Sequence, residues 1–193
     1  EVLLVVGLTM GGTTAFYTYT TTMQKILRLQ VKLTDDQTTT VVFGSLLFAT
    51  LLQPIYGAIS DKIGRRPLLM MFGILGTLCT IPLLTMLAGT KDPWVAFIIV
   101  CAAWMIVAGY TSINAVVKAE LFPTNVRAMG VGLPYAITVA VFGGTADFVA
   151  LKMQELGHPE WYYWYLTGVI FLSFLVYATM RDTKKDSAME RHS

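Results

Sequence analysis

Long uncharged stretches alternate with short charged ones along the whole chain. Each apolar stretch is close to the roughly 20 residues that a helix needs to cross the hydrocarbon core of a bilayer. The pattern therefore predicts an all-α, polytopic membrane protein with six transmembrane helices. The predicted spans are approximately 2–22, 39–59, 68–89, 94–118, 128–151 and 161–180, and residues 181–193 form a short polar tail.

The composition agrees with a membrane chain. Hydrophobic residues make up 55% of the sequence and charged residues 13%, whereas soluble domains carry about a quarter charged residues. The net charge of +2 is small and scattered, which argues against a nucleic-acid partner. The apolar pattern starts directly after Glu1 with no signal peptide, so we expect the chain to be a fragment that begins at the edge of a helix.

Residues with catalytic or metal-binding chemistry are scarce. Cys79 and Cys101 lie inside apolar runs without CxxC spacing, which favours packed core residues over a disulfide or a metal site. His158 and His192 both lie outside the predicted spans. We therefore expect a protein that is not an enzyme and that uses no metal or other cofactor.

The distribution of Lys and Arg predicts the orientation in the membrane. With the charged link at residues 57–67 in the cytoplasm, nine basic residues lie on the cytoplasmic side and five on the opposite side. Both ends of the chain are then expected to be cytoplasmic. The first set is Lys62, Arg65, Arg66, Lys118, Arg127, Arg181, Lys184, Lys185 and Arg191, and the second is Lys25, Arg28, Lys32, Lys91 and Lys152.

Two spans carry polar faces. A hydroxyl-rich face in a membrane helix either bonds to neighbouring helices or lines a wet cavity, and both alternatives stay open here. In the fourth span Tyr110, Asn114 and Lys118 are four residues apart and so in line, with Lys118 near the helix end. Helical spacing in the first span puts Thr13, Tyr17, Thr20, Thr21 and Gln24 on one side.

Asp147 is the acidic residue that lies well inside an apolar run. An acid at membrane depth is a candidate for proton exchange with a wet cavity. The alternative, which we favour, is a structural ion pair with Lys152, five residues further along the chain.

Two charged segments resemble motifs of a known family. For the segment at residues 57–66, one alternative is a basic loop whose charges only set the orientation of the chain in the membrane. The spacing of this segment, however, resembles the short cytoplasmic loop of the major facilitator superfamily. The segment at residues 120–130 resembles a cytoplasmic motif of the sugar-porter and metabolite:H+ symporter branches. The segments are Gly57-x-x-x-Asp61-Lys62-x-Gly64-Arg65-Arg66 and Glu120-Leu-Phe-Pro123-Thr-x-x-Arg127-Ala-x-Gly130.

More narrowly, the chain resembles the bacterial α-ketoglutarate permeases. The string Phe142-Gly-Gly-x-Ala is followed by Asp147 where those permeases are expected to have Glu. The resemblance implies the C-terminal half of a twelve-helix transporter in the bacterial inner membrane, with a missing N-terminal six-helix half as partner. It implies proton-coupled symport of a small carboxylate, α-ketoglutarate or a similar dicarboxylate, by alternating access.

Other substrates and functions stay open. Related symporters carry citrate, shikimate, proline or betaine. A membrane sensor or scaffold is disfavoured, because the tail has no heptads for a coiled coil.

The resemblance also implies roles for particular residues. We expect the main carboxylate-binding cation in the missing half, because this half offers none near mid-membrane. The expected substrate-cavity residues are Tyr17, Thr20, Gln24, Tyr110 and Asn114; the expected gating residues are Gly57, Asp61, Lys62, Gly64, Arg65, Arg66, Glu120 and Arg127.

Overall fold

The structure is a computed structural model that describes residues 2–122, 127–181 and 183; the side chains of Val2, Arg127 and Ala128 are outside the described part. Within these ranges all regular structure is helical, as predicted. Apart from Arg181 and Thr183, the predicted tail is outside the described residues. The elements are α1 (Val2–Tyr17), η1 (Thr18–Thr22), α2 (Met23–Ile26), η2 (Leu27–Val31), α3 (Asp35–Ile63), α4 (Arg65–Gly89), α5 (Pro93–Thr111), α6 (Asn114–Glu120), α7 (Arg127–Thr138), η3 (Val139–Gly143), α8 (Ala146–Glu155) and α9 (Glu160–Thr179).

The helices extend beyond the apolar stretches that predict them. Helix α3 starts after Thr34, whose hydroxyl accepts from the Gln37 amide while the Gln37 side chain accepts from the Thr34 amide, a capping box. It continues to Ile63, so Gly64 alone separates α3 from α4. Gly64 has a φ of 100°, which residues with a Cβ rarely adopt. The charged link at residues 57–67, which the sequence suggested to be a loop, is therefore helical on both sides of Gly64.

Five helices are long and apolar enough to cross a membrane, by length and composition, within the part of the chain that the structure describes. They are Asp35–Ile63, Arg65–Gly89, Pro93–Glu120, Met129–Glu155 and Glu160–Thr179. The helix that begins with α1 is not among these five. Its Thr14, Thr18 and Thr22 are fully buried, so these hydroxyls face other helices and not the outside.

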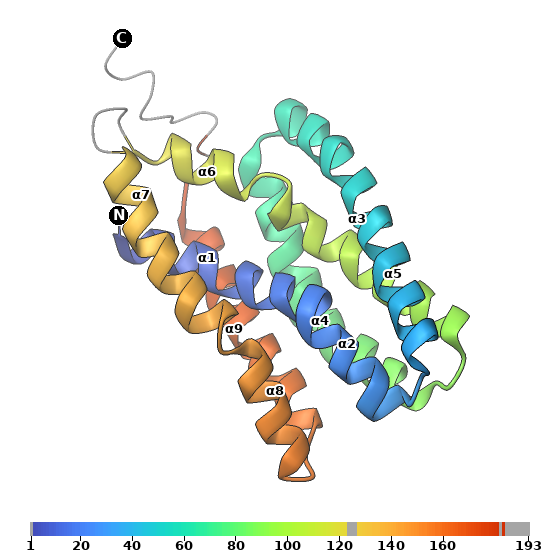
Figure 1. Cartoon of the computed structure of the whole chain (residues 1–193). Helices are drawn as coiled ribbons and strands as arrows, with labels where there is room; N and C mark the ends of the chain where they lie inside the picture. The colour runs from blue at the N-terminus through green and yellow to red at the C-terminus, as the bar shows by residue number, and fades with distance from the viewer. Residues whose placement is uncertain (1, 123–126, 182, 184–193) are drawn as a thin grey trace.

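The helices pack as a bundle in which α1, α4, α5 and α9 make the central contacts. Helix α9 lies against α1 and α4, and α5 lies against α3 and α4. Helix α1 also contacts α7 and η3, so that α3 and α7 flank opposite sides of the bundle (Figure 1). The contact between α3 and α5 thus has a counterpart in the contact between α7 and α1. The contact between α4 and α5 likewise has a counterpart in the contact between α9 and α1. Such a pattern is typical of two three-helix repeats.

Direct hydrogen bonds join α1 to α9. The Ser173 hydroxyl donates to the Gly7 carbonyl oxygen at 2.6 Å and accepts from the Gly11 amide at 2.8 Å. The Tyr177 hydroxyl donates to the Leu8 carbonyl oxygen at 2.9 Å. A Cβ at Gly11 would come within 2.9 Å of the Ile170 Cα. The glycine therefore permits the close approach that these bonds need.

Candidate functional site

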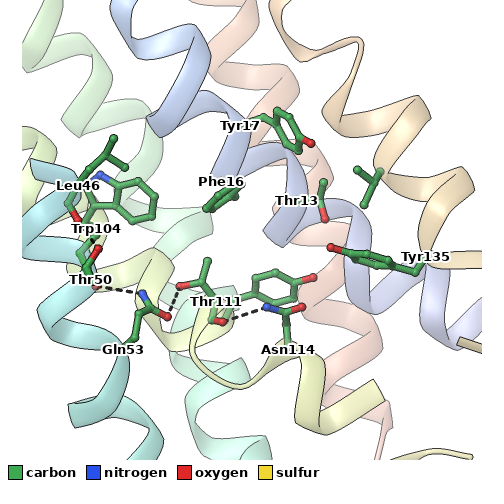
Figure 2. Close-up of a pocket in the computed structure, with 13 residues that line it drawn as sticks. Thr13, Phe16, Tyr17, Leu46, Thr50, Gln53, Trp104, Thr111, Asn114 and Tyr135 are labelled. Atoms are coloured by element: carbon green, nitrogen blue, oxygen red, sulfur yellow. Dashed lines mark hydrogen bonds between the residues drawn. The ribbon is translucent and has the colours of Figure 1, made fainter. Parts of the chain in front are cut away.

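A cavity of about 340 Å³ opens between α1, α3, the α5–α6 segment and the α7–η3 segment. Figure 2 shows Gln53, Thr111 and Asn114 on one side of this space and Thr13 and Tyr17 on another. The wall combines hydroxyl and amide groups with aromatic rings, and it contains no charged side chain. The lining residues are Thr13, Phe16, Tyr17, Leu46, Ala49, Thr50, Gln53, Trp104, Tyr110, Thr111, Asn114, Tyr135 and Val139.

Hydrogen bonds hold the polar part of this wall. The Thr111 hydroxyl donates to the Gln53 side-chain oxygen at 3.1 Å, and the Gln53 amide nitrogen donates to the Ala49 carbonyl at 3.1 Å. The Asn114 amide nitrogen donates to the Thr111 carbonyl at 3.0 Å. These bonds fix two side-chain amides at the edge of the cavity. Among the described residues, no three His, Cys, Asp or Glu side chains form a group that could hold a metal ion.

Lys118 lies directly behind this wall. Its side chain is only 2% exposed. Its ammonium donates to the Asn114 Oδ1 at 3.1 Å and to the Tyr110 hydroxyl at 3.4 Å, and it lies 4.0 Å from the centroid of the Tyr135 ring. All three partners line the cavity.

The predicted cavity residues separate into two groups. Tyr17, Tyr110 and Asn114 line the cavity, whereas Thr20 and Gln24 do not. The Thr20 hydroxyl donates to the Phe16 carbonyl at 2.7 Å, and Gln24 is exposed. The π-helical segment η1 explains the separation, because its wider turn shifts the register and ends the face that regular spacing would continue.

Arg65, at the start of α4, forms the centre of a partly buried ion-pair cluster. Its guanidinium donates to Asp61 Oδ1 at 2.7 Å, to the Ser60 hydroxyl at 3.0 Å and to Glu120 Oε1 at 3.3 Å. The Thr183 hydroxyl donates to the other Glu120 oxygen at 2.6 Å. We name these five residues the Arg65 cluster. The cluster ties α3, α4 and α6 together near one end of the bundle.

The other predicted gating residues are not members of this cluster. Arg66 donates to the Ala178 carbonyl near the end of α9 at 2.8 Å. Lys62 is exposed, and a Cβ on Gly57 would meet nothing within 4 Å. Arg127 starts α7, and its side chain is outside the described part.

Asp147 is paired, but not with the residue that we favoured. Its carboxylate accepts from the Lys25 ammonium at 2.7 Å and from the Thr22 hydroxyl. Lys152 instead lies 3.1 Å from Glu155, one turn along α8. The favoured ion pair with Lys152 is therefore wrong. Proximity in sequence was misleading, because η1 and α2 of the first helix pack beside the start of α8.

Several cavity residues were missed by sequence reasoning. Gln53 precedes Pro54 in an otherwise apolar stretch, and Thr111 and Tyr135 carried no signal of their own. Lys118 did carry one, since it is in line with Tyr110 and Asn114. Lys118 lies near the end of α6 as expected, but its burial was not foreseen, because the break between α5 and α6, after which α6 contacts α7, is not evident in the sequence.

The profile of the Major Facilitator Superfamily matches residues 2–192. The chain is 42% identical over 174 residues to an alpha-ketoglutarate permease of Escherichia coli K12, with 90% of this chain and 40% of the permease covered. It is 31% identical over 147 residues to a citrate-proton symporter of Klebsiella pneumoniae, covering 74% of this chain and 32% of the symporter. No solved structure matches the chain.

An ectoine/proline transporter of Corynebacterium glutamicum is 30% identical over 158 residues, with 80% of this chain and 31% of the transporter covered. The chain therefore spans less than half the length of the relatives that it matches. The names of these relatives refer to different solutes. The comparisons therefore establish the family of this chain but not its solute.

Proposed function

Because the chain belongs to the major facilitator superfamily, we propose that it forms one half of a secondary transporter that moves a small carboxylate together with protons. The preferred substrate is α-ketoglutarate or a similar dicarboxylate. The chain covers 40% of the E. coli permease, so a second half of six helices is part of the proposal.

The observation that carries this proposal is the polar cavity between the long helices. Its volume of about 340 Å³ is within the range of small-molecule sites, roughly 300–1,000 Å³. Tyr17, Tyr110, Asn114 and Gln53 offer hydroxyl and amide groups that can donate to carboxylate oxygens. The 42% identity to an alpha-ketoglutarate permease supports a dicarboxylate as the substrate.

The Arg65 cluster supports a switching role for the predicted gating residues. In alternating access, two halves rock about a central site, and contacts at the membrane faces bias the two states. Asp61 is 71% exposed although it pairs with Arg65. In this proposal the exposed side of Asp61, together with Gly57 and Lys62, meets the second half at the cytoplasmic face in one state and leaves it in the other.

Asp147 stays the candidate for proton coupling in this half. Its ion pair with Lys25 joins α2 to α8. Protonation of the carboxylate would weaken this ion pair and loosen the contact between the two helices. A proton could thereby bias the conformational equilibrium.

In the organism we place the chain in the bacterial inner membrane as a multi-pass protein with both ends in the cytoplasm. The excess of Lys and Arg on the side of the Arg65 cluster supports this orientation. A membrane-impermeant, cysteine-reactive label tests this orientation in the variant Lys62→Cys. We expect the label to attach only when it is added from the cytoplasmic side.

The experiment that tests the function is uptake of radiolabelled α-ketoglutarate into vesicles that contain the assembled carrier. We expect uptake to require a proton gradient, to collapse with an uncoupler and to be blocked by unlabelled dicarboxylates. Citrate, shikimate and proline are the competitors that test the alternatives. Uptake that proline or shikimate blocks, or no uptake, would contradict the proposed substrate.

A further inference from the structure

Lys118 is a buried cation without an opposite charge from the described part of the chain. Its ammonium has only neutral partners there: the Asn114 amide oxygen, the Tyr110 hydroxyl and the ring of Tyr135. No ion pair of Lys118 with Asp or Glu occurs among the described residues. A buried charge that lacks a counter-charge is costly in a low-dielectric interior.

Two acids that are at least partly buried in the described part of the chain are engaged elsewhere. Glu120, two residues along α6, pairs with Arg65 at 3.3 Å and also accepts from Thr183. Asp147 pairs with Lys25 at 2.7 Å. Within the described part of the chain, these two acids thus neutralise Arg65 and Lys25, whereas Lys118 is left to neutral groups.

The neutral groups hold the ammonium without cancelling its charge. Tyr135 places its ring face 4.0 Å from the ammonium, a cation–π contact that fixes the position of the cation. The Asn114 side chain is held by Thr111, and its oxygen accepts from Lys118. Because Asn114, Tyr110 and Tyr135 also line the cavity, an anion seated between them would be separated from the ammonium by one layer of side chains at most.

We propose that Lys118 is the cationic group in this half that binds one carboxylate of the substrate. A carboxylate in the cavity next to Asn114 and Tyr135 provides the missing opposite charge, and the ammonium moves onto it from the Tyr135 ring. Charge-assisted hydrogen bonds of this kind are short and strong. The inference rests on the proposed function and departs from the expectation that this half offers no carboxylate-binding cation.

The test measures inhibition constants with Lys118→Met in the assembled carrier. Three inhibitors compete with the uptake of labelled α-ketoglutarate: unlabelled α-ketoglutarate, 2-oxopentanoate, which has a methyl group in place of the distal carboxylate, and 4-oxopentanoate, which has one in place of the proximal carboxylate. We expect the constants for α-ketoglutarate and for one of the two monocarboxylates to rise about tenfold or more. The constant for the other monocarboxylate should stay within about twofold, which identifies the carboxylate that Lys118 binds.

Inhibition constants do not depend on the amount of folded carrier, so partial misfolding cannot imitate this pattern. If Lys118→Met yields no folded carrier, Lys118→Arg keeps the charge and should change the same two constants by a smaller factor. Lys152→Met, which removes an exposed lysine from α8, is the control and should change none. Equal changes for all three compounds, or no change, would overturn the role of Lys118. If the unsubstituted carrier binds none of the three, the proposed function fails and the inference fails with it.

Discussion

Two residues of the same short helix, Lys118 and Glu120, end in opposite electrostatic surroundings. Glu120 is 8% exposed and is met by Arg65 and Thr183. Lys118 is 2% exposed and is met only by neutral groups among the described residues. The buried charges of the Arg65 cluster are therefore paired within this half, whereas the charge of Lys118, behind the cavity, is left for a ligand in the cavity to neutralise. The comparison distinguishes a buried charge that stabilises the protein from one that is kept for a ligand.

The largest expected effect on stability comes from breaking the buried ion pair of Glu120 with Arg65. Glu120→Gln leaves the Arg65 guanidinium, whose side chain is 13% exposed, without its buried carboxylate. We expect a loss of about 3 kcal/mol in the free energy of unfolding, since Asp61 still pairs with Arg65. Unfolding in detergent with increasing denaturant measures this loss. Glu155→Gln, which breaks the exposed pair with Lys152, is the control and should cost no more than about 0.5 kcal/mol. Equal losses in the two variants would show that the Arg65 cluster does not stabilise the fold.

A smaller effect is expected from changing the geometry of the Arg65 cluster without changing its charges. Gly64→Ala places a Cβ at a φ of 100°, and we expect it to destabilise the protein by roughly 1–2 kcal/mol. The same unfolding experiment measures it. Gly168→Ala, where a Cβ meets nothing within 4 Å, should not destabilise the protein. A neutral Gly64→Ala would mean that the turn between α3 and α4 readily adopts another conformation.

The pair between Asp147 and Lys25 is intermediate between the two sides of the comparison. Its side chains are 27% and 39% exposed, so solvent screens the attraction. Asp147→Asn should therefore cost less than about 1 kcal/mol in unfolding free energy. If Asp147 carries the coupling proton, the same variant should lose proton-driven uptake while exchange of labelled for unlabelled substrate continues. Unchanged proton-driven uptake would remove Asp147 from the coupling mechanism.

The smallest effect on stability is expected from replacing Lys118, the buried cation without an opposite charge among the described residues. Lys118→Met keeps the apolar stem of the side chain and removes a charge that has no opposite charge nearby. In the absence of substrate we expect the free energy of unfolding to change by less than about 1 kcal/mol, or to rise slightly. A loss as large as that of Glu120→Gln would contradict the comparison, because Lys118 would then be a structural residue.

The sequence allowed the helices to be predicted better than the contacts between them. The apolar stretch 39–59 located α3 (Asp35–Ile63) to within a few residues at each end. The one-residue turn at Gly64 was missed because Asp61 and Arg65 are compatible both with a loop and with helix ends. Periodicity placed Tyr17 at the cavity, but it also suggested Thr20 and Gln24, because nothing in the Thr-rich stretch revealed the π-helical register shift.

The two most informative charges could not be assigned from local spacing. The partner of Asp147 is Lys25, 122 residues away in the sequence, and the Lys118 ammonium lies 4.0 Å from the centroid of the Tyr135 ring on α7. Both facts depend on how distant helices pack. Local sequence rules predict a helix and its faces, but not which distant residue meets a given face.

Thermal stability of the assembled carrier with and without α-ketoglutarate tests the central claim most directly, because ligand binding to the folded state raises its stability. We predict that saturating α-ketoglutarate raises the melting temperature of the unsubstituted carrier and that Lys118→Met loses most of this rise at the same concentration, while its melting temperature without substrate stays close to that of the parent. An equal rise in the two proteins would contradict the claim that the substrate neutralises Lys118.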